Sequence, residues 1–174
     1  MNVLAHPSPA LAERACEVDP TADATLLDLI ARMAREMYDA PGIGLAAPQI
    51  GVLKRVIVYD LDDEGGDGLQ VLCNPVIVET SDECETDDEG CLSLPGISVP
   101  VNRACRVRCE ALTIDGKPVS VEADGLHARL LQHEIDHLDG VLIIDRADAE
   151  ERKAALRRYR EAVEAGARPG QTSI

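Results

Sequence analysis

Two histidines separated by three residues stand in the segment His133-Glu134-Ile135-Asp136-His137. On a helix, residues four apart lie on one face, one turn from each other, so both imidazoles can reach a single metal ion. Glu134 follows the first histidine directly, and its carboxylate can reach a water molecule on that metal without binding the metal itself. A metal lowers the pKa of such a water, and a nearby carboxylate can take the proton. The spacing therefore predicts metal-assisted hydrolysis.

A catalytic metal of this kind usually has three protein ligands and one position left for water. Ile143 stands where a metzincin has its third histidine, which excludes that class. A thermolysin-like site would take its third ligand from a glutamate on the next helix. Glu150 and Glu151 are available, but they follow the motif too closely to leave room for the end of the first helix, a turn and a second helix. Cys91 lies in a turn-rich segment, and a thiolate beside a dication is deprotonated and binds strongly. Spacing alone does not choose it over the other cysteines, which are Cys16, Cys73, Cys84, Cys105 and Cys109.

The apolar pattern places the two histidines on a helix with a largely buried side. Apolar residues recur with helical spacing from Leu126 to Leu138, and also from Leu26 to Met37 before Pro41-Gly42. Ser8-Pro9 is typical of a helix start. We predict helices over about 9–17, 26–37, 126–138 and 148–165.

Strand-like segments fill the middle of the sequence. They are β-branched or alternating, and they cover Val56–Tyr59, Leu69–Val78, Cys105–Leu112 and Val119–Ala123. Helices come before and after these strands, without regular alternation. This order predicts an α+β fold with mostly antiparallel sheets around the central helix that carries the metal motif, flanked by N- and C-terminal helices. Cys73, Cys105 and Cys109 are expected in the core.

Length, charge and composition exclude several classes of protein. A chain of 174 residues predicts a single domain, 1–174, and 45% apolar residues argue against disorder. A formal net charge of −15, with no Trp or Phe, argues against a DNA-binding protein. Apolar runs are too short for a membrane span, and the first 20 residues do not resemble an export signal. We therefore expect a cytoplasmic protein with reduced cysteines.

Acidic residues concentrate in one stretch of the chain. Residues 60–89 contain twelve carboxylates, and no Lys or Arg lies between Arg55 and Arg103. Within this stretch, Asp62 to Gly68 is predicted to form an exposed turn between two strands.

Three segments of the sequence share an order and a spacing with a known family. They are Gly42–Gln49 (GIGLAAPQ), Glu89–Ser93 (EGCLS) and Gln132–Gly140 (QHEIDHLDG). Together they resemble the three signature motifs of the peptide deformylase family, and the likeness extends from about residue 3 to the last helix. The resemblance implies an enzyme that removes the N-formyl group from the N-terminal formyl-methionine of nascent polypeptides and releases formate. A metal-bound hydroxide is then expected to attack the formyl carbon.

The resemblance also assigns the metal ligands. The cysteine of the second motif and both histidines of the third map to Cys91, His133 and His137. The family usually holds Fe²⁺, and Ni²⁺, Co²⁺ or Zn²⁺ can occupy the site. The ligand types alone would favour zinc, so the expectation of iron rests on the family.

The family's catalytic residues map onto this sequence as well. Glu134 is expected to act as general acid and base, and the Gln49 amide and the backbone N–H of Leu92 to donate to the oxyanion. Loss of such a donor typically raises a reaction barrier by roughly 3–4 kcal/mol. Glu89, paired with Arg103, is expected to hold one metal ligand in place.

Substrate-binding positions follow from the same likeness. Family positions that bind substrate map to Ile43, Gly44, Leu126 and Leu130, of which Ile43, Leu126 and Leu130 line the methionine pocket. Gly42 and Gly44 would let a peptide main chain approach closely.

Two residues depart from the family pattern. His127 stands where the family usually has an apolar residue, and Asp87 where some members have an apolar pocket residue. Both departures bear on peptide preference rather than on the reaction.

The predicted last helix suggests a further partner. It carries five cations and no acid from residue 152 to 160, namely Arg152, Lys153, Arg157, Arg158 and Arg160. Such a surface could dock on ribosomal RNA near the nascent chain. A solvated helix face remains an equal alternative.

Two other functions remain open from the sequence alone. A zinc metallopeptidase acting on unformylated peptides would not depend on Cys91. A metal or thiol sensor would bind metal without turnover and would be unaffected by a Glu134→Ala change.

Overall fold

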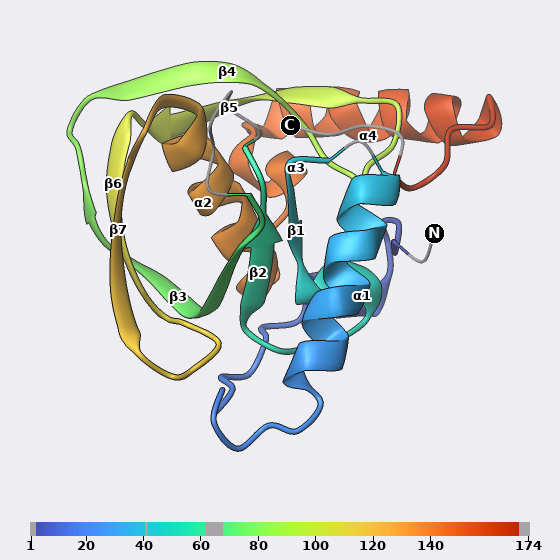
Figure 1. Ribbon diagram of the computed structural model, residues 1–174. Helices are drawn as coiled ribbons and strands as arrows, with labels where there is room; N and C mark the ends of the chain where they lie inside the picture. The colour runs from blue at the N-terminus through green and yellow to red at the C-terminus, as the bar shows by residue number, and fades with distance from the viewer. Residues whose placement is uncertain (1–2, 41, 62–67, 171–174) are drawn as a thin grey trace.

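Antiparallel strands and a few helices make up the computed structural model, which describes residues 3–40, 42–61 and 68–170 (Figure 1). The strands are β1 Gly44–Ala46, β2 Val56–Tyr59, β3 Gln70–Thr80, β4 Cys84–Gly90, β5 Ser98–Ala104, β6 Arg106–Leu112 and β7 Pro118–Asp124. The helices are α1 Leu26–Asp39, α2 Gly125–Leu138, α3 Ile143–Arg146 and α4 Ala149–Glu164, with short 3₁₀ helices η1 Pro9–Ala12 and η2 Ala47–Ile50. The predicted α+β class is confirmed.

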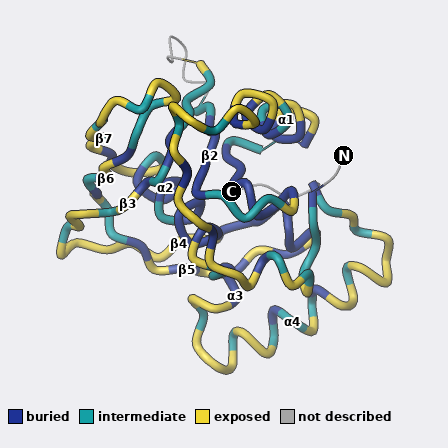
Figure 2. The backbone as a smooth tube through the Cα atoms, turned by 90° about the horizontal axis from the view of Figure 1, so that it is seen from below, coloured by how far each residue is buried: buried dark blue, intermediate teal, exposed yellow. Residues whose placement is uncertain are grey.

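Two antiparallel sheets form the framework. The larger sheet has the strand order β1-β2-β3-β6-β7, and β4 pairs with β5 in a separate two-stranded sheet. Helix α2 lies between these strands, α1 covers the β1–β2 end and α4 lies along β5 (Figure 1). In Figure 2 the buried residues gather at the centre of the molecule, while the outer turns are mostly exposed. Elements from both sheets therefore meet around α2.

Helix α2 is buried along most of its length, since every residue from Ala128 to Leu138 except Gln132 is buried. Leu130, Leu131 and Leu138 have no exposed surface, and they pack against residues of β1, β2 and β6. A helix is buried on several sides only when other elements enclose it, and strands of both sheets pack against this one. The predicted boundaries, 126–138, agree with the structure to within one residue.

The helices predicted near the two ends have different outcomes. Residues 26–37 fall in α1, where Met33 and Met37 are fully buried, and the last helix agrees with α4. The predicted helix over 9–17 is wrong, because only η1 forms, residues 13–17 are not helical and Cys16 forms an isolated β-bridge with Lys54. The amide N–H of Ala15 donates to the carbonyl of Leu138, which holds this segment against the end of α2. A tertiary contact has replaced the helical hydrogen bonds that the capping signal favoured.

The four predicted strands are present as β2, β3, β6 and β7, but three others were not predicted. Strand β1 has only three residues, and β5 contains Pro100. Strand β4 has five exposed residues followed by buried Glu89 and Gly90, and it resembles a solvated loop in sequence. Its backbone pairs with β5 along its whole length. The predicted turn at 62–68 lies outside the described residues except for Gly68.

Two of the three cysteines expected in the core are there. Cys73 and Cys109 have no exposed surface. The prediction that Cys105 lies in the core is wrong. Cys105 lies between β5 and β6, where the chain passes from one sheet to the other, and it is only half-buried.

None of the helices in the described ranges is long and apolar enough to cross a membrane.

Candidate metal centre

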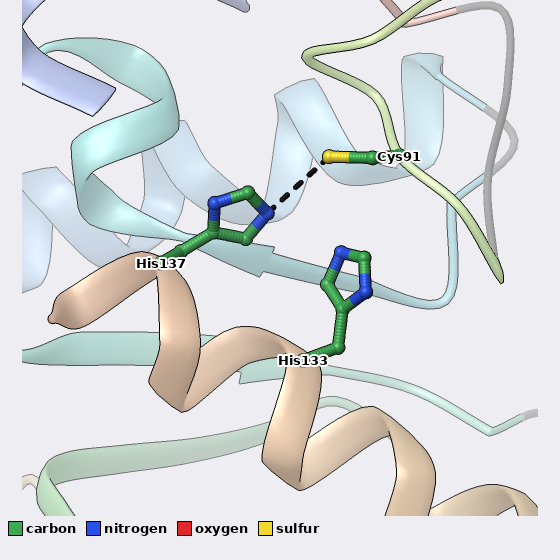
Figure 3. A group of neighbouring side chains, drawn as sticks. All are labelled: Cys91, His133 and His137. Atoms are coloured by element: carbon green, nitrogen blue, oxygen red, sulfur yellow. Dashed lines mark hydrogen bonds between the residues drawn. The ribbon is translucent and has the colours of Figure 1, made fainter. Parts of the chain in front are cut away.

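Two elements far apart in the sequence bring Cys91, His133 and His137 together. Cys91 begins the turn that follows β4, and the histidines lie one turn apart on α2 (Figure 3). One ligand atom from each lies within 4.8 Å of the others, and the Cys91 Sγ is 3.3 Å from the His137 Nε2. Each residue is at most 3% exposed. A buried set of one thiol and two imidazoles suits a divalent cation.

Burial keeps the Cys91 thiol and the His137 imidazole uncharged when no cation is nearby. It raises the pKa of the Cys91 thiol to about 12. Burial, followed by the charge of His133, also holds the pKa of His137 well below its usual value. A metal needs neutral imidazoles and reverses the effect on the thiol, which it deprotonates. The donor set therefore fits a bound metal ion.

Glu134 lies beside this cluster with its carboxylate only partly satisfied. It is 1% exposed, and its Oε2 has no hydrogen-bond partner among the described residues. Burial, with the nearby charge of Glu89 as a smaller cause, raises the pKa of the Glu134 carboxyl to about 8. A buried carboxylate with a free oxygen and a pKa near neutrality is suited to accept and return a proton.

Gly44 lies directly against this carboxylate. A Cβ atom on Gly44 would lie 2.6 Å from the Glu134 Oε1, and one on Gly42 would lie 3.0 Å from the Leu92 Cδ1. The sequence predicts that both glycines let a peptide main chain approach. The structure adds a reason within the protein, since a side chain at Gly44 would displace Glu134.

Glu89 links the metal cluster to two arginines. It has no exposed surface, and its Oε2 is 2.9 Å from the His133 Nδ1. Arg103 donates from Nε and Nη2 to the two Glu89 oxygens, both at 2.9 Å, and Arg129 donates to Oε1 at 2.8 Å. Burial alone would raise the pKa of Glu89, but the hydrogen bonds from Arg103 and His133 outweigh it and lower the pKa. The structure thus brings together the expected pair, Glu89 and Arg103.

Two residues of this network were missed in the sequence. Arg129 and Asp136 lie on α2 with His133 between them, and Asp136 accepts from the Arg103 Nη1 at 2.6 Å and from the Arg146 Nε at 2.9 Å. Residues 129, 133 and 136 are four and three apart, so they form a polar stripe along one face of a largely buried helix. That stripe was the available signal.

Gln49 lies on η2, next to Cys91. Its Oε1 accepts from the backbone N–H of Ala46 at 2.9 Å, which orients the amide. Its Nε2 then lies 3.3 Å from the Ser93 Oγ and 3.9 Å from the Cys91 Sγ. The amide N–H₂ group therefore points to the region around Cys91.

A cavity of about 10 Å³ lies among these groups, which is room for about one water molecule. It is lined by Ile43, Gly44, Gln49, Cys91, Leu92, His133 and Glu134. Leu126 and Leu130 do not line it. Leu126 is 53% exposed at the start of α2, and Leu130 is fully buried in the core.

The two departures from the family pattern lie at different places. The His127 Nε2 is 3.3 Å from the Tyr59 Oη, and the two rings contact each other with centroids 5.2 Å apart. Asp87 is exposed on β4, opposite Val101 of β5.

Comparisons with known proteins agree with this geometry. The family model described as polypeptide deformylase matches residues 1–153. The chain belongs to this family. A peptide deformylase of Acidothermus cellulolyticus is 52% identical over 144 residues, which cover 83% of this chain and 77% of the relative. One of Pelotomaculum thermopropionicum is 53% identical over 137 residues, covering 79% and 84%.

Solved structures of the deformylase family show the same fold. A peptide deformylase of Legionella pneumophila has a TM-score of 0.86 at 40% identity and covers 94% of this chain and 95% of its own. That of Thermus thermophilus has a TM-score of 0.85 at 36% identity, with coverages of 94% and 95%. As a member of this deformylase family the chain is an enzyme, its family role is the deformylation of nascent peptides, and the family is metal-dependent.

Proposed function

We propose that this enzyme removes the N-formyl group from the formyl-methionine of nascent polypeptides and releases formate at the centre formed by Cys91, His133 and His137. The observation that carries the proposal is the position of Glu134. Its carboxylate, whose Oε2 has no hydrogen-bond partner among the described residues, lies beside three ligand atoms that are within 4.8 Å of one another. Deformylation and peptide hydrolysis both need this arrangement, and the family membership favours deformylation.

Cys91, His133 and His137 would hold one divalent cation. When bound, the cation would polarise the formyl carbonyl and lower the pKa of a water molecule. We expect Fe²⁺, as in the family, with Ni²⁺, Co²⁺ or Zn²⁺ able to take its place.

Glu134 would move the proton. Its carboxylate accepts a proton from the attacking water and returns it to the methionine nitrogen as formate leaves. Burial raises the pKa of this carboxyl well above its ordinary value in the metal-free centre, and a bound cation would lower it again, so the group can take up and release a proton near neutral pH.

The Gln49 amide and the backbone N–H of Leu92 would donate to the formyl oxygen as it gains negative charge. The hydrogen bond from Ala46 fixes the Gln49 amide before substrate arrives, so no reorganisation is needed during the reaction. We infer that Glu89 and Arg103 hold His133 in place.

Substrate would enter beside Ile43 and Gly44, which line the cavity, with Leu126 contributing apolar surface at its exposed position. Leu130 would also line the methionine pocket. Because its side chain has no exposed surface, it would contact methionine only after a local movement.

The test is formate release from a formyl-Met tripeptide, using protein loaded with iron or nickel without oxygen. Wild type should turn over, and Glu134→Ala should bind the metal but lose activity by about 10²–10⁴-fold. Cys91→Ala should lose the metal. The unformylated tripeptide serves as the control substrate. Its cleavage, without formate release from the formylated peptide, would indicate the zinc metallopeptidase instead.

We also propose that the outer face of α4 contacts the ribosome. Two of its five cations are paired, Arg152 with Asp145 and Arg158 with Glu151. Lys153, Arg157 and Arg160 are exposed and make no ion pair within the described ranges. They are the cations that could contact phosphate.

Co-sedimentation with ribosomes tests this partner. Removal of α4 would also remove the buried Tyr159, so charge reversal is the sharper variant. Lys153→Glu, Arg157→Glu and Arg160→Glu combined should abolish binding at low salt. The same three charge changes at exposed Arg14, Arg35 and Lys117 should not. Equal binding by both triple variants would rule out α4 as the contact. A cytoplasmic location, which ribosome contact requires, stays a prediction.

A further inference from the structure

Arg129 is a buried arginine on α2, one turn before His133. It is 8% exposed, and each of its terminal nitrogens has an acceptor. Nη1 donates to the Glu89 Oε1 at 2.8 Å and to the carbonyl of Val101 at 2.9 Å, and Nη2 donates to the carbonyl of Glu85 at 2.9 Å. The guanidinium therefore joins the metal-binding helix to both strands of the small sheet.

The carboxylate of Glu89 uses all of its acceptor positions. Oε1 accepts from the Arg103 Nε and the Arg129 Nη1, and Oε2 accepts from the Arg103 Nη2 and the His133 Nδ1. A carboxylate has about four such positions, so the plane of the group is fixed in every direction. Without Arg129, one position on Oε1 would be empty in a place that water does not reach.

The balance of charge also requires a second buried arginine. Glu89 and Asp136 are both buried carboxylates, and Arg103 pairs with both. One guanidinium cannot neutralise two carboxylates. Arg146 supplies charge to Asp136 from a position that is 47% exposed, and Arg129 supplies it to Glu89 from within the core. Loss of a partner from a buried ion pair leaves a charge without compensation.

We propose that Arg129 is a positioning residue of the metal centre, acting through Glu89 on His133. The hydrogen bond from the His133 Nδ1 to Glu89 leaves Nε2 as the nitrogen for a metal and sets the direction of the ring. Arg129 holds Glu89 so that this direction is kept. The inference rests on the proposed metal centre.

A different role is possible for the same contacts, and it predicts a different result. Arg129 could serve only to join α2 to β4 and β5 through the carbonyls of Glu85 and Val101. Its loss would then lower thermal stability but would leave metal binding unchanged in the folded protein. A measurement of metal binding to the folded protein distinguishes the two roles.

The experiment uses Arg129→Met, which keeps most of the side-chain volume. The apoprotein is titrated with Zn²⁺ alone for affinity and with Co²⁺ alone for the visible absorption of the bound ion. We expect the zinc dissociation constant to rise about 10–100-fold, the usual cost of losing a partner that orients a ligand. The cobalt bands should also shift, because the ring of His133 is no longer fixed. Arg129→Lys should show an intermediate change, and it serves if Arg129→Met does not fold.

Arg55→Met is the matched control. Arg55 is 5% exposed and donates to the carbonyls of Leu138 and Pro75 and to Asp139, but to no atom of Glu89. It should lose stability without a change in the cobalt spectrum.

A double-mutant cycle with Glu89→Gln tests the route of the effect. If Arg129 acts through Glu89, adding Arg129→Met to Glu89→Gln should change the zinc dissociation constant by less than about threefold. A folded Arg129→Met or Arg129→Lys protein with wild-type zinc affinity and cobalt spectrum would overturn the proposal, as would a full effect in the Glu89→Gln background. Failure of the wild-type chain to bind Zn²⁺ would instead refute the metal centre, and the role of Arg129 with it.

Discussion

At the scale of single residues, the centre depends on side chains whose burial disfavours their charged forms. Cys91 and Glu134 are buried where their charged forms are poorly solvated, and the pKa of each is raised. Such groups cost stability in the absence of a cation and become useful when one is bound. Gly44 lacks a side chain and so leaves space for the Glu134 carboxylate.

Gly44→Ala should therefore impair the reaction without removing the metal. The new Cβ would meet the Glu134 Oε1 at 2.6 Å, and the carboxylate would have to move. We expect formate release to fall by about 10²-fold, since a displacement of about 1 Å at a reacting group can cost this much. Zinc affinity should stay within the wild-type range. Stability should fall by about 1–3 kcal/mol in urea denaturation.

The same change in a Glu134→Ala background provides the control. With the carboxylate removed, Gly44→Ala should cost much less stability, because the clash is gone. An equal loss in both backgrounds would show that Gly44 is required for another reason.

At the scale of elements, the sequence predicted best where the signal was local. The spacing of α1 and α2 and the alternation of β2, β3, β6 and β7 are properties of neighbouring residues, and all of these elements are present. Strand β4 was missed because its exposed acids have low strand propensity, and it forms because β5 pairs with it. The absence of a helix around Ala15 has a similar cause, since a contact with Leu138 overrode a helix signal.

The site shows the same division. The two histidines and Glu134 follow from helical spacing alone, and their neighbourhood on α2 required no tertiary information. The choice of Cys91 among six cysteines required the family likeness, because nothing local distinguishes it. The contacts of Arg129 join a helix to two strands that are 28 and 44 residues away in sequence, and no local pattern carries them.

Tyr159 is one of the residues that hold helix α4 to the body. The residue is 6% exposed, packs with apolar residues that include Leu94 and Ile143, and its Oη donates to the carbonyl of His6 at 2.7 Å. Tyr159→Phe should cost about 1 kcal/mol for the hydrogen bond, and Tyr159→Ala about 3–5 kcal/mol, since it also removes packing. Urea denaturation measures both. Equal losses in the two variants would mean that the ring contributes little to docking.

At the scale of the whole molecule, the metal centre couples stability to pH. In the metal-free protein the pKa of Glu134 is about 8, against an ordinary value of 4.5. Between these values the folded chain keeps a proton that the unfolded chain has lost, so stability falls as pH rises. His137 has the opposite effect, but only below its ordinary value of 6.5, and the raised pKa of Cys91 matters only above its ordinary value of 9.0. The window from pH 6.5 to 8 therefore belongs to Glu134.

We expect the chelated protein to lose roughly 1–2 kcal/mol of unfolding free energy from pH 6.5 to 8. The unfolding free energy of the Glu134→Gln variant should not change with pH over this window, because the amide of glutamine does not titrate. Excess Zn²⁺ should stabilise the wild type and reverse the slope, since the metal replaces the proton of Cys91. Denaturant titrations at several pH values measure this. A flat profile for the chelated wild type would contradict the raised pKa.

Strand β4 has a consequence for how fast an ion arrives. Its exposed acids, Glu85, Asp87 and Asp88, lie on the strand that leads directly into Cys91. Their negative potential raises the local concentration of cations at the end of the chain segment that supplies the thiol. We therefore expect the metal-free centre to capture a divalent ion faster in dilute buffer than at high salt, because added salt screens the charges of β4. The same exposed acids that make β4 resemble a loop in sequence would thus attract cations toward the metal centre.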